Sequence, residues 1–202
     1  MKALHKPNLF CWSVFNEERN LDFHSVFWTS AHGNVAIDPL PLNEHDRRHV
    51  EALGGIQDIV ITNSDHLRGT VELVATSGAR VWAPRLELER LQEVKAQGVG
   101  DGEQPIAGLE LFELHGSKTP GELAILIEHH TLVVGDLVRG HRAGRLNLLP
   151  DAKLQDRTQA LASLRRLTEL SSIEAVLVGD GWPVFHGGRH ALNALLIELE
   201  GP

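Results

Sequence analysis

A buried strand followed by a polar loop constrains this chain more than any other stretch. Residues 59–61 read Ile-Val-Ile, an apolar β-branched run, and Thr62 ends it. Residues 63–69 then read Asn-Ser-Asp-His-Leu-Arg-Gly, and a helix-like segment begins at Thr70. In α/β proteins, polar side chains that bind or react usually lie at the carboxyl end of a buried strand. The stretch therefore predicts an α/β fold with a functional loop after residue 61.

The amino-acid composition limits the classes of protein to which this chain can belong. Of the 202 residues, 42% are hydrophobic and 23% are charged, which is typical of a globular chain with its own core. The formal net charge of −8 argues against a nucleic-acid partner, because phosphate contacts need a concentrated basic surface. No apolar run approaches the roughly 18 residues that span a membrane, and residues 1–8 lack the apolar centre of a signal peptide. Since Cys11 is the single cysteine, we expect a cytoplasmic protein without internal disulfides.

The spacing of apolar residues predicts strands and helices in both halves of the chain. Turn residues such as Gly33 and Asn34 separate the first apolar runs, which favours antiparallel hairpins there. Asn43 is expected to cap a helix, and Gly78 to end another. We interpret residues 137–150 as irregular and expect a single domain over residues 1–202. The expected strands are residues 9–15, 23–29, 35–38, 58–62, 80–83, 109–114, 123–127, 131–134 and 173–178, and the expected helices are residues 45–53, 70–77, 86–97, 153–170 and 189–199.

Several of the expected strands end in polar loops, namely residues 62–68, 115–122, 135–136 and 179–181. In this order the loops resemble the metallo-β-lactamase fold superfamily. Its strand ends carry a T-H-x-H-x-D-H loop, a G-H-T-P-G turn, a Gly-Asp and a last G-H-G. Ile37-Asp38 also resembles the opening strand of that family. The resemblance implies the α/β (α+β) class, a four-layer αββα sandwich with mixed sheets, a metal site at the strand ends, and hydrolase chemistry.

Most of the family's metal-binding histidines are missing from these loops. In an ungapped alignment the ligand positions hold Asn63, Asp65, Leu67, Arg68, Lys118, Asp136 and Asp180. Of these, only Asp136 keeps the family's residue type. A gapped alternative matches residues 65–69 to the family's D-H-x-G-G segment and retains one Asp65–His66 pair. We favour the ungapped register because Thr62 and its strand fix the start of the loop, and the gapped register stays open.

The residue types at these positions suit ion pairs better than two zinc ions. Zinc needs imidazole, thiolate or carboxylate ligands, whereas lysine and arginine only donate hydrogen bonds. We therefore expect Arg68 and Lys118 to neutralise the nearby carboxylates. The expected cofactor is none, or a single divalent ion (zinc, iron or manganese), rather than a full dinuclear zinc centre. The candidate ligands of a single ion are Asp65, His66, Asp136 and Asp180.

An arginine-rich segment follows Asp136. Residues 139–145 read Arg-Gly-His-Arg-Ala-Gly-Arg, and guanidinium groups bind carboxylate or phosphate through paired hydrogen bonds. The segment is interpreted either as a solvated loop or as part of an anion-binding site. Trp182 either lines the same pocket or belongs to the core. The candidate substrate-binding residues are Asn63, Arg68, Arg139, Arg142 and Trp182.

Two function classes follow. The first is a hydrolase of a small anionic ester, thioester or lactone, in which a carboxylate or His66 acts as base or holds one metal ion, and Lys118 or Arg68 stabilises an oxyanion. The second is a non-catalytic binding or sensing protein that keeps the fold and a charged pocket. In both cases the expected partner is a small molecule, neither nucleic acid nor a membrane is expected, and a homo-oligomer is left open. The candidate catalytic residues are Asp65, His66, Lys118, Asp136 and Asp180.

Overall fold

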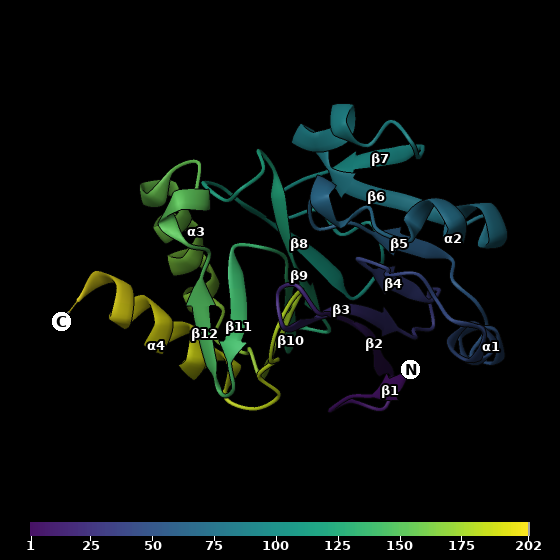
Figure 1. Ribbon diagram of the computed structural model, residues 1–202, viewed down its shortest axis with the longest axis horizontal. Coiled ribbons are helices and arrows are strands. Elements are labelled where there is room, and N and C mark those ends of the chain that lie inside the picture. The colour runs from purple at the N-terminus through teal and green to yellow at the C-terminus, as the bar shows by residue number, and fades with distance from the viewer. Residues whose placement is uncertain (202) are drawn as a thin grey trace. The chain divides into compact units, whose positions relative to one another are not determined.

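The computed structural model describes residues 1–201, and the chain forms two compact units. The first unit is Met1–Val99 and the second begins at Gly100. Each unit combines a sheet with helices, purple to teal and teal to yellow in Figure 1. The mixed α/β class predicted from the sequence is therefore confirmed.

The first unit contains a seven-stranded sheet in the order β1-β2-β3-β4-β5-β6-β7. Pairing is antiparallel from β1 to β4 and parallel from β4 to β7, so the sheet is mixed. Its strands are β1 (Lys2–Ala3), β2 (Leu9–Asn16), β3 (Leu21–Trp28), β4 (Val35–Ile37), β5 (Asp58–Val60), β6 (Arg80–Pro84) and β7 (Ala96–Val99). Its helices are α1 (Glu44–Ala52) and α2 (Thr70–Ser77), with 3-10 turns η1 (Ser64–His66) and η2 (Arg85–Arg90).

The core of the first unit lies between this sheet and its two α-helices. Phe27 and Ile59 are fully buried and share one hydrophobic cluster with Val50 of α1 and Leu73 of α2. The caps are those expected from the sequence. Asn43 Oδ1 accepts a hydrogen bond from the Asp46 backbone N–H at 2.8 Å, and Gly78 ends α2 in the left-handed conformation.

The second unit contains a four-stranded sheet in the order β13-β10-β9-β8 and a separate hairpin, β11-β12. The β10–β13 pair is parallel and the others are antiparallel. Leu164 of α3 and Leu192 of α4 pack into the hydrophobic cluster of this sheet. The elements are β8 (Leu109–Leu114), β9 (Glu122–Ile127), β10 (Thr131–Val134), β11 (Val138–Arg142), β12 (Arg145–Leu148), η3 (Asp151–Lys153), α3 (Arg157–Glu169), β13 (Ala175–Val178) and α4 (Gly188–Glu200).

Two predicted segments are wrong. Residues 86–97 do not form a helix, since a 3-10 turn is followed by β7, which pairs in parallel with β6 and satisfies its backbone there. Residues 137–150 are not irregular but contain the β11–β12 hairpin, in which Ala143 and Gly144 turn the chain and Gly144 takes a φ of 74°. Helix α3 begins at Arg157 rather than at the expected residue 153. Asp156 caps it, because its side chain accepts the Gln159 backbone N–H at 3.0 Å.

No helix among residues 1–201 is both long and apolar enough to cross a membrane.

Strand β11 and the loop after β13 touch backbone to backbone. The Trp182 N–H donates to the Gly140 carbonyl at 2.6 Å, and the Gly140 N–H donates to the Asp180 carbonyl at 3.3 Å. A Cβ on Gly140 would lie 2.0 Å from the Trp182 carbonyl oxygen, and one on Gly181 would lie 2.4 Å from the Gly140 carbonyl oxygen. Only glycine permits this approach, which places Asp180 beside the hairpin.

Substituting two glycines of this unit, both of which have a positive φ, should separate backbone strain from steric clash. Gly181 (φ +86°) has the close backbone neighbour, whereas Gly144 (φ +74°) has nothing within 4 Å of an added Cβ. Gly144→Ala should lower the free energy of unfolding by about 1–2 kcal/mol, the cost of a left-handed alanine. Gly181→Ala should lower it by about 2 kcal/mol more, because the backbone must also move apart. Urea unfolding measures both, and equal losses would contradict the close contact.

Candidate functional site

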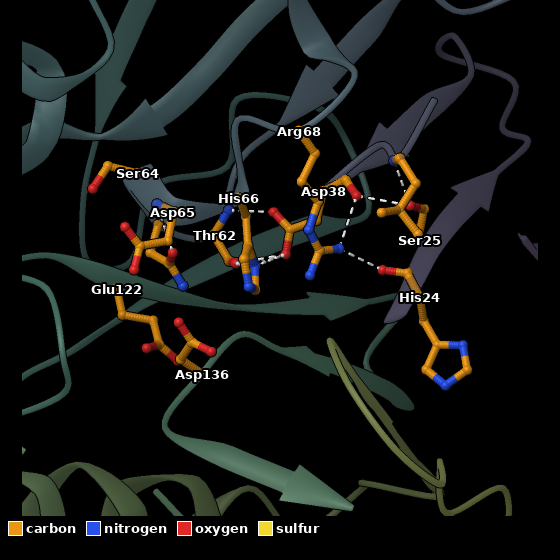
Figure 2. A network of polar contacts seen from close by, with 12 residues as sticks. His24, Ser25, Asp38, Thr62, Ser64, Asp65, His66, Arg68, Glu122 and Asp136 are labelled. Carbon is orange, nitrogen blue, oxygen red and sulfur yellow. Dashed lines mark hydrogen bonds and ion pairs between the residues drawn. The ribbon is translucent and has the colours of Figure 1, made fainter. Parts of the chain in front are cut away.

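The loop after β5 begins at Thr62, which is held by the carboxylate of Asp38. The Thr62 backbone N–H donates to Asp38 Oδ1 at 2.7 Å, and its hydroxyl donates to Asp38 Oδ2 at 2.6 Å (Figure 2). Asp38 directly follows β4, which pairs in parallel with β5, so the two strand ends meet at one edge of the sheet. The carboxylate of one strand thereby fixes the start of the loop on the next.

His66 is bound by the same carboxylate. Its Nδ1 lies 2.7 Å from Asp38 Oδ2 and 3.0 Å from the Thr62 hydroxyl, and the residue is 6% exposed. An ionised carboxylate only accepts hydrogen bonds, so Nδ1 carries the hydrogen and donates. In the neutral form of this imidazole the lone pair is on Nε2, which is the nitrogen atom that can accept a proton.

Asp38 is buried, yet its charged form is favoured. Burial raises the pKa of Asp38, but the charge and hydrogen bond of His66, the Arg68 guanidinium and the Thr62 hydroxyl together outweigh burial and hold the pKa below its usual range. Asp38 also takes a φ of 47°, a left-handed conformation that aspartate tolerates better than most residues. The residue is thus fixed both by its backbone and by its charge partners.

Arg68 lies against main-chain oxygens. Its Nη1 donates to the carbonyl oxygen of His24 at 2.7 Å and to that of Asp38 at 3.2 Å (Figure 2), and the guanidinium lies 5.7 Å from the centre of the Phe23 ring. The expected neutralisation of Asp65, Asp136 and Asp180 by Arg68 stays a prediction, whereas the Arg68 guanidinium is one of the groups that lower the pKa of Asp38. Arg68 ties β3, β4 and the loop together, which is a structural role.

Glu87 holds the loop from a second direction. Its side chain is fully buried, and its Oε2 accepts the Ser64 backbone N–H at 2.5 Å. Asn63 is fully buried as well and caps η1, since its Oδ1 accepts the Asp65 backbone N–H at 3.0 Å. The Asn63 Nδ2 has no hydrogen-bond partner within residues 1–201, which leaves a buried donor in the loop. Asp65 itself is exposed.

In the second unit, Glu122 organises the turn before β9. It is fully buried, and its Oε2 accepts the Ser117 hydroxyl at 2.6 Å while its Oε1 accepts the Leu137 backbone N–H at 2.9 Å. Gly116 lies so close to α3 that a Cβ would approach the Asp156 carbonyl oxygen to 2.2 Å. These contacts fix the segment between β8 and β9 that carries Lys118.

A chain of alternating charges runs through the strand ends of the second unit. Lys118 Nζ lies 2.9 Å from Asp136 Oδ2, and Arg139 Nη2 lies 2.7 Å from Asp136 Oδ1. Arg139 Nη1 also lies 3.7 Å from Asp180 Oδ2, which is 3.3 Å from His141 Nε2. Both carboxylates and Arg139 are buried, with 3–6% exposure. Two cations thus neutralise two buried carboxylates, as such burial requires.

The predicted site residues fall into two groups. Within the first unit, Asn63, Asp65, His66 and Arg68 lie on one loop, and within the second unit Lys118, Asp136, Arg139 and Asp180 form one chain of ion pairs. Arg142 and Trp182 are exposed, and Trp182 at 59% is not a core residue. Arg139 is not in a solvated loop, because it bridges the two buried carboxylates.

Three buried carboxylates that organise the site were not among the candidate residues of the sequence. Asp38 had a signal, since it ends a strand at the family-like Ile37-Asp38 pair. Glu87 and Glu122 had none, because a glutamate in a short segment is more often a solvated side chain. Their burial depends on backbone N–H groups from distant segments of the chain.

The residues present do not fit a dinuclear metal centre. The positions that the resemblance gives to ligands hold an amide that caps η1, an arginine on backbone carbonyls, and a lysine paired with Asp136. Asp136 and Asp180 already have cationic neighbours in the chain itself. Across residues 1–201, no group of three or more His, Cys, Asp or Glu side chains is arranged to hold a metal ion.

Comparison with known proteins shows what this fold is similar to. The family model of the metallo-beta-lactamase superfamily matches residues 1–199. A metallo-beta-lactamase structure from Pontibacter korlensis is 18% identical, with a TM-score of 0.77 over 99% of this chain and 98% of that chain. A metallo-beta-lactamase family protein from Thermus thermophilus is 17% identical, with a TM-score of 0.71 over 96% of this chain and 79% of that chain.

A further similar structure is a metallo-beta-lactamase from Erythrobacter litoralis, 14% identical with a TM-score of 0.70 over 96% of this chain and 89% of that chain. No curated protein matches the sequence. At these identities the solved structures show a shared fold and nothing of its chemistry. The fold expected from the order of the strand-end loops is therefore confirmed.

Replacing Asp38 by Asn should destabilise the protein in a pH-dependent way. At pH 7 the loss should be about 3 kcal/mol, because the amide cannot accept from Thr62 and His66 together. The lowered pKa of Asp38 means that its stabilisation is present above the unfolded pKa of about 3.9 and is lost as pH falls through the lower folded pKa. Urea unfolding from pH 7 down to pH 3 should therefore show the difference between wild type and Asp38→Asn shrinking.

The matched control is Glu72→Gln, which removes one partner of the exposed Arg47–Glu72 pair. It should change the free energy of unfolding by less than about 1 kcal/mol. A difference between wild type and Asp38→Asn that stays constant on acidification would contradict the charged state assigned to Asp38.

Replacing Arg139 by Gln should show that the buried ion pairs support the fold. The change leaves Asp136 and Asp180 buried with one cation fewer, and should lower the free energy of unfolding by about 3–5 kcal/mol. Arg157→Gln is the control, since Arg157 pairs with Asp151 at 3.3 Å on an exposed surface. This substitution should lower the free energy of unfolding by less than about 1 kcal/mol. Similar small effects for both variants would argue against a structural network.

Proposed function

The chain belongs to the metallo-beta-lactamase superfamily, a hydrolase-type family, and from that premise we propose that it is a hydrolase-type protein that acts without a dinuclear metal centre. The observation that carries the proposal is the Lys118–Asp136–Arg139–Asp180 chain of ion pairs. Asp136 is the one residue type of the family's ligand set that this chain retains, and its two oxygens lie at 2.9 Å and 2.7 Å from cationic nitrogens.

Charge balance supports this proposal. A metal ion at Asp136 would have to compete with the positive charges of Lys118 and Arg139, and the displaced guanidinium would have to find another partner inside the protein. Buried charges without partners are costly. Lysine and arginine in this place therefore supply the countercharge that metal ions supply to a carboxylate-rich site.

The base in the proposed reaction is His66. Asp38 accepts the Nδ1 hydrogen of His66 and holds the ring in one orientation. Nε2 is then the atom that takes a proton from water as the water attacks an acyl carbon. Asn63 on the same loop contributes a buried amide donor, Nδ2, suited to a carbonyl or oxyanion oxygen. In this proposal Asp38 is a positioning residue.

The proposed substrates are small esters, thioesters or lactones. Their acyl carbons are electrophilic enough for water that is activated by a general base alone. Amides and β-lactams are not the first candidates, since an amine is a poorer leaving group than an alcohol or a thiol and its departure needs more stabilisation of the transition state.

The test combines elemental analysis with an activity panel. Protein purified without chelator should hold less than one tightly bound metal ion per chain, and hydrolysis of an ester, thioester and lactone panel should be insensitive to EDTA. His66→Gln should lower kcat at least about 100-fold, because general-base catalysis contributes on that scale. The control is His32→Gln, an exposed histidine in a turn, which should leave kcat unchanged.

Two outcomes would change the assignment. Two stoichiometric, tightly held metal ions together with turnover lost in EDTA would overturn the proposal. Tight binding of a small anion without turnover of any panel member would favour a non-catalytic binding or sensing protein instead. That second candidate is favoured by the ion pairs themselves, since buried charges that neutralise one another stabilise a fold without needing to react.

A further inference from the structure

The tip of the β11–β12 hairpin places two arginines against each other. Arg142 and Arg145 are directly opposed across the hairpin, separated by the two-residue turn at Ala143 and Gly144. Both side chains are exposed, and neither forms an ion pair or a hydrogen bond with another residue in the described part of the chain. Like charges at directly opposed positions repel each other and destabilise a hairpin. An anion bound between them would remove this repulsion.

A pocket of about 310 Å³ lies at this pair of arginines. It is lined by both of them, by His141 and Asn147, and by Glu198 of α4. The Asn147 Oδ1 accepts the His141 backbone N–H at 2.9 Å, which fixes the hairpin backbone beside the pocket. Guanidinium groups bind carboxylate and phosphate through parallel hydrogen bonds, so the pocket suits a small anionic group.

A second pocket of about 530 Å³ continues from the first. The two share Arg145, Leu146 and Glu198 in their lining. The second is also lined by Val184, by apolar residues of α4 that include Ala194 and Leu195, and by His186 and His190. Helix α4 and strand β12 lie in contact along this face of the second unit (Figure 1). The shared residues therefore join a cationic end to a larger end that has both apolar side chains and imidazole groups.

We propose that this double pocket binds an organic anion with one charged head group and an apolar body. The carboxylate or phosphate head lies between Arg142 and Arg145, and the apolar body extends over Ala194 and Val184. Glu198 lies at the junction and repels a second negative charge, which selects ligands with a single anionic end. The site uses none of the groups assigned to hydrolysis, so it stands independently of the proposed function.

Hexyl phosphate, hexanoate, inorganic phosphate and 1-hexanol are the probes, measured by isothermal titration calorimetry. At least one of the two hexyl anions should bind. Its affinity should exceed that of inorganic phosphate and of 1-hexanol by about tenfold or more, because inorganic phosphate lacks the apolar body and 1-hexanol lacks the anionic head group. Comparing hexyl phosphate with hexanoate shows which head group the arginines prefer. Binding should weaken as the salt concentration rises.

The decisive variants separate the two ends of the pocket. The double substitution Arg142→Gln/Arg145→Gln should weaken binding of the preferred hexyl anion by about tenfold or more, and should raise stability slightly because the opposed charges are gone. Ala194→Glu, at an exposed position of α4, should weaken the hexyl anion more than inorganic phosphate. The matched control, Arg47→Gln/Arg157→Gln, removes the same charge from two exposed surface pairs and should leave binding unchanged.

Several results would overturn the site. These are undetectable binding of both hexyl anions at millimolar concentration, equal binding by wild type and the Arg142→Gln/Arg145→Gln variant, or equal weakening in the control variant. Retained binding of the hexyl anion in His66→Gln would confirm that this pocket and the proposed hydrolytic site are separate.

Discussion

The buried carboxylate of Asp38 is the interaction on which the strand-end loop of the first unit depends. It accepts hydrogen bonds from the backbone and hydroxyl of Thr62 and from the imidazole of His66, and its own backbone carbonyl accepts from Ser25 at 2.7 Å and from Arg68. Through its carboxylate and its carbonyl oxygen, Asp38 therefore links β3, β4 and the end of β5 with the loop. Because Asp38 is buried, removing any partner leaves polar groups without hydrogen bonds, so the contacts of the loop depend on one another.

In the second unit, ion pairs stabilise two buried carboxylates. Asp136 and Asp180 end two strands that point their carboxyl ends to the same edge, since β10 and β13 are parallel. Two buried carboxylates at one edge repel each other unless cations lie between them. Arg139, on the adjacent hairpin, forms ion pairs with both carboxylates. Lys118, in the turn before β9, forms an ion pair with Asp136. The superfamily's fold is thus kept, with ion pairs at the ends of these two strands.

The close approach of Gly140 and Gly181 links this charge network to the hairpin. Only glycines allow the backbones to touch there, and the contact puts Arg139 and His141, on either side of Gly140, beside Asp180. The same hairpin carries Arg142 and Arg145 at its tip, next to the turn. One short hairpin therefore supplies both a buried structural cation and an exposed pair of cations, and their opposite environments imply different roles.

Much of the fold follows from local sequence. Helix α2 begins and ends where the apolar pattern and Gly78 predict, and Asn43 caps α1 as expected, because caps and turns depend on neighbouring residues. Residues 86–97 were misassigned as a helix because their leucines have helical spacing, while pairing with β6 decides their structure. The hairpin at residues 138–148 was missed because arginine and glycine carry no strand pattern of their own.

The sequence by itself determined the fold family and the positions of the strand-end loops, since strand spacing, glycines and loop order are properties of the linear chain. In the ungapped register it also predicted lysine, arginine and asparagine at positions where the family has metal-binding histidines. Only the tertiary structure decided which charges meet. Arg139 is buried between Asp136 and Asp180 rather than solvated, and Arg68 lies on carbonyl oxygens, because distances between segments far apart in the chain depend on how strands and turns pack.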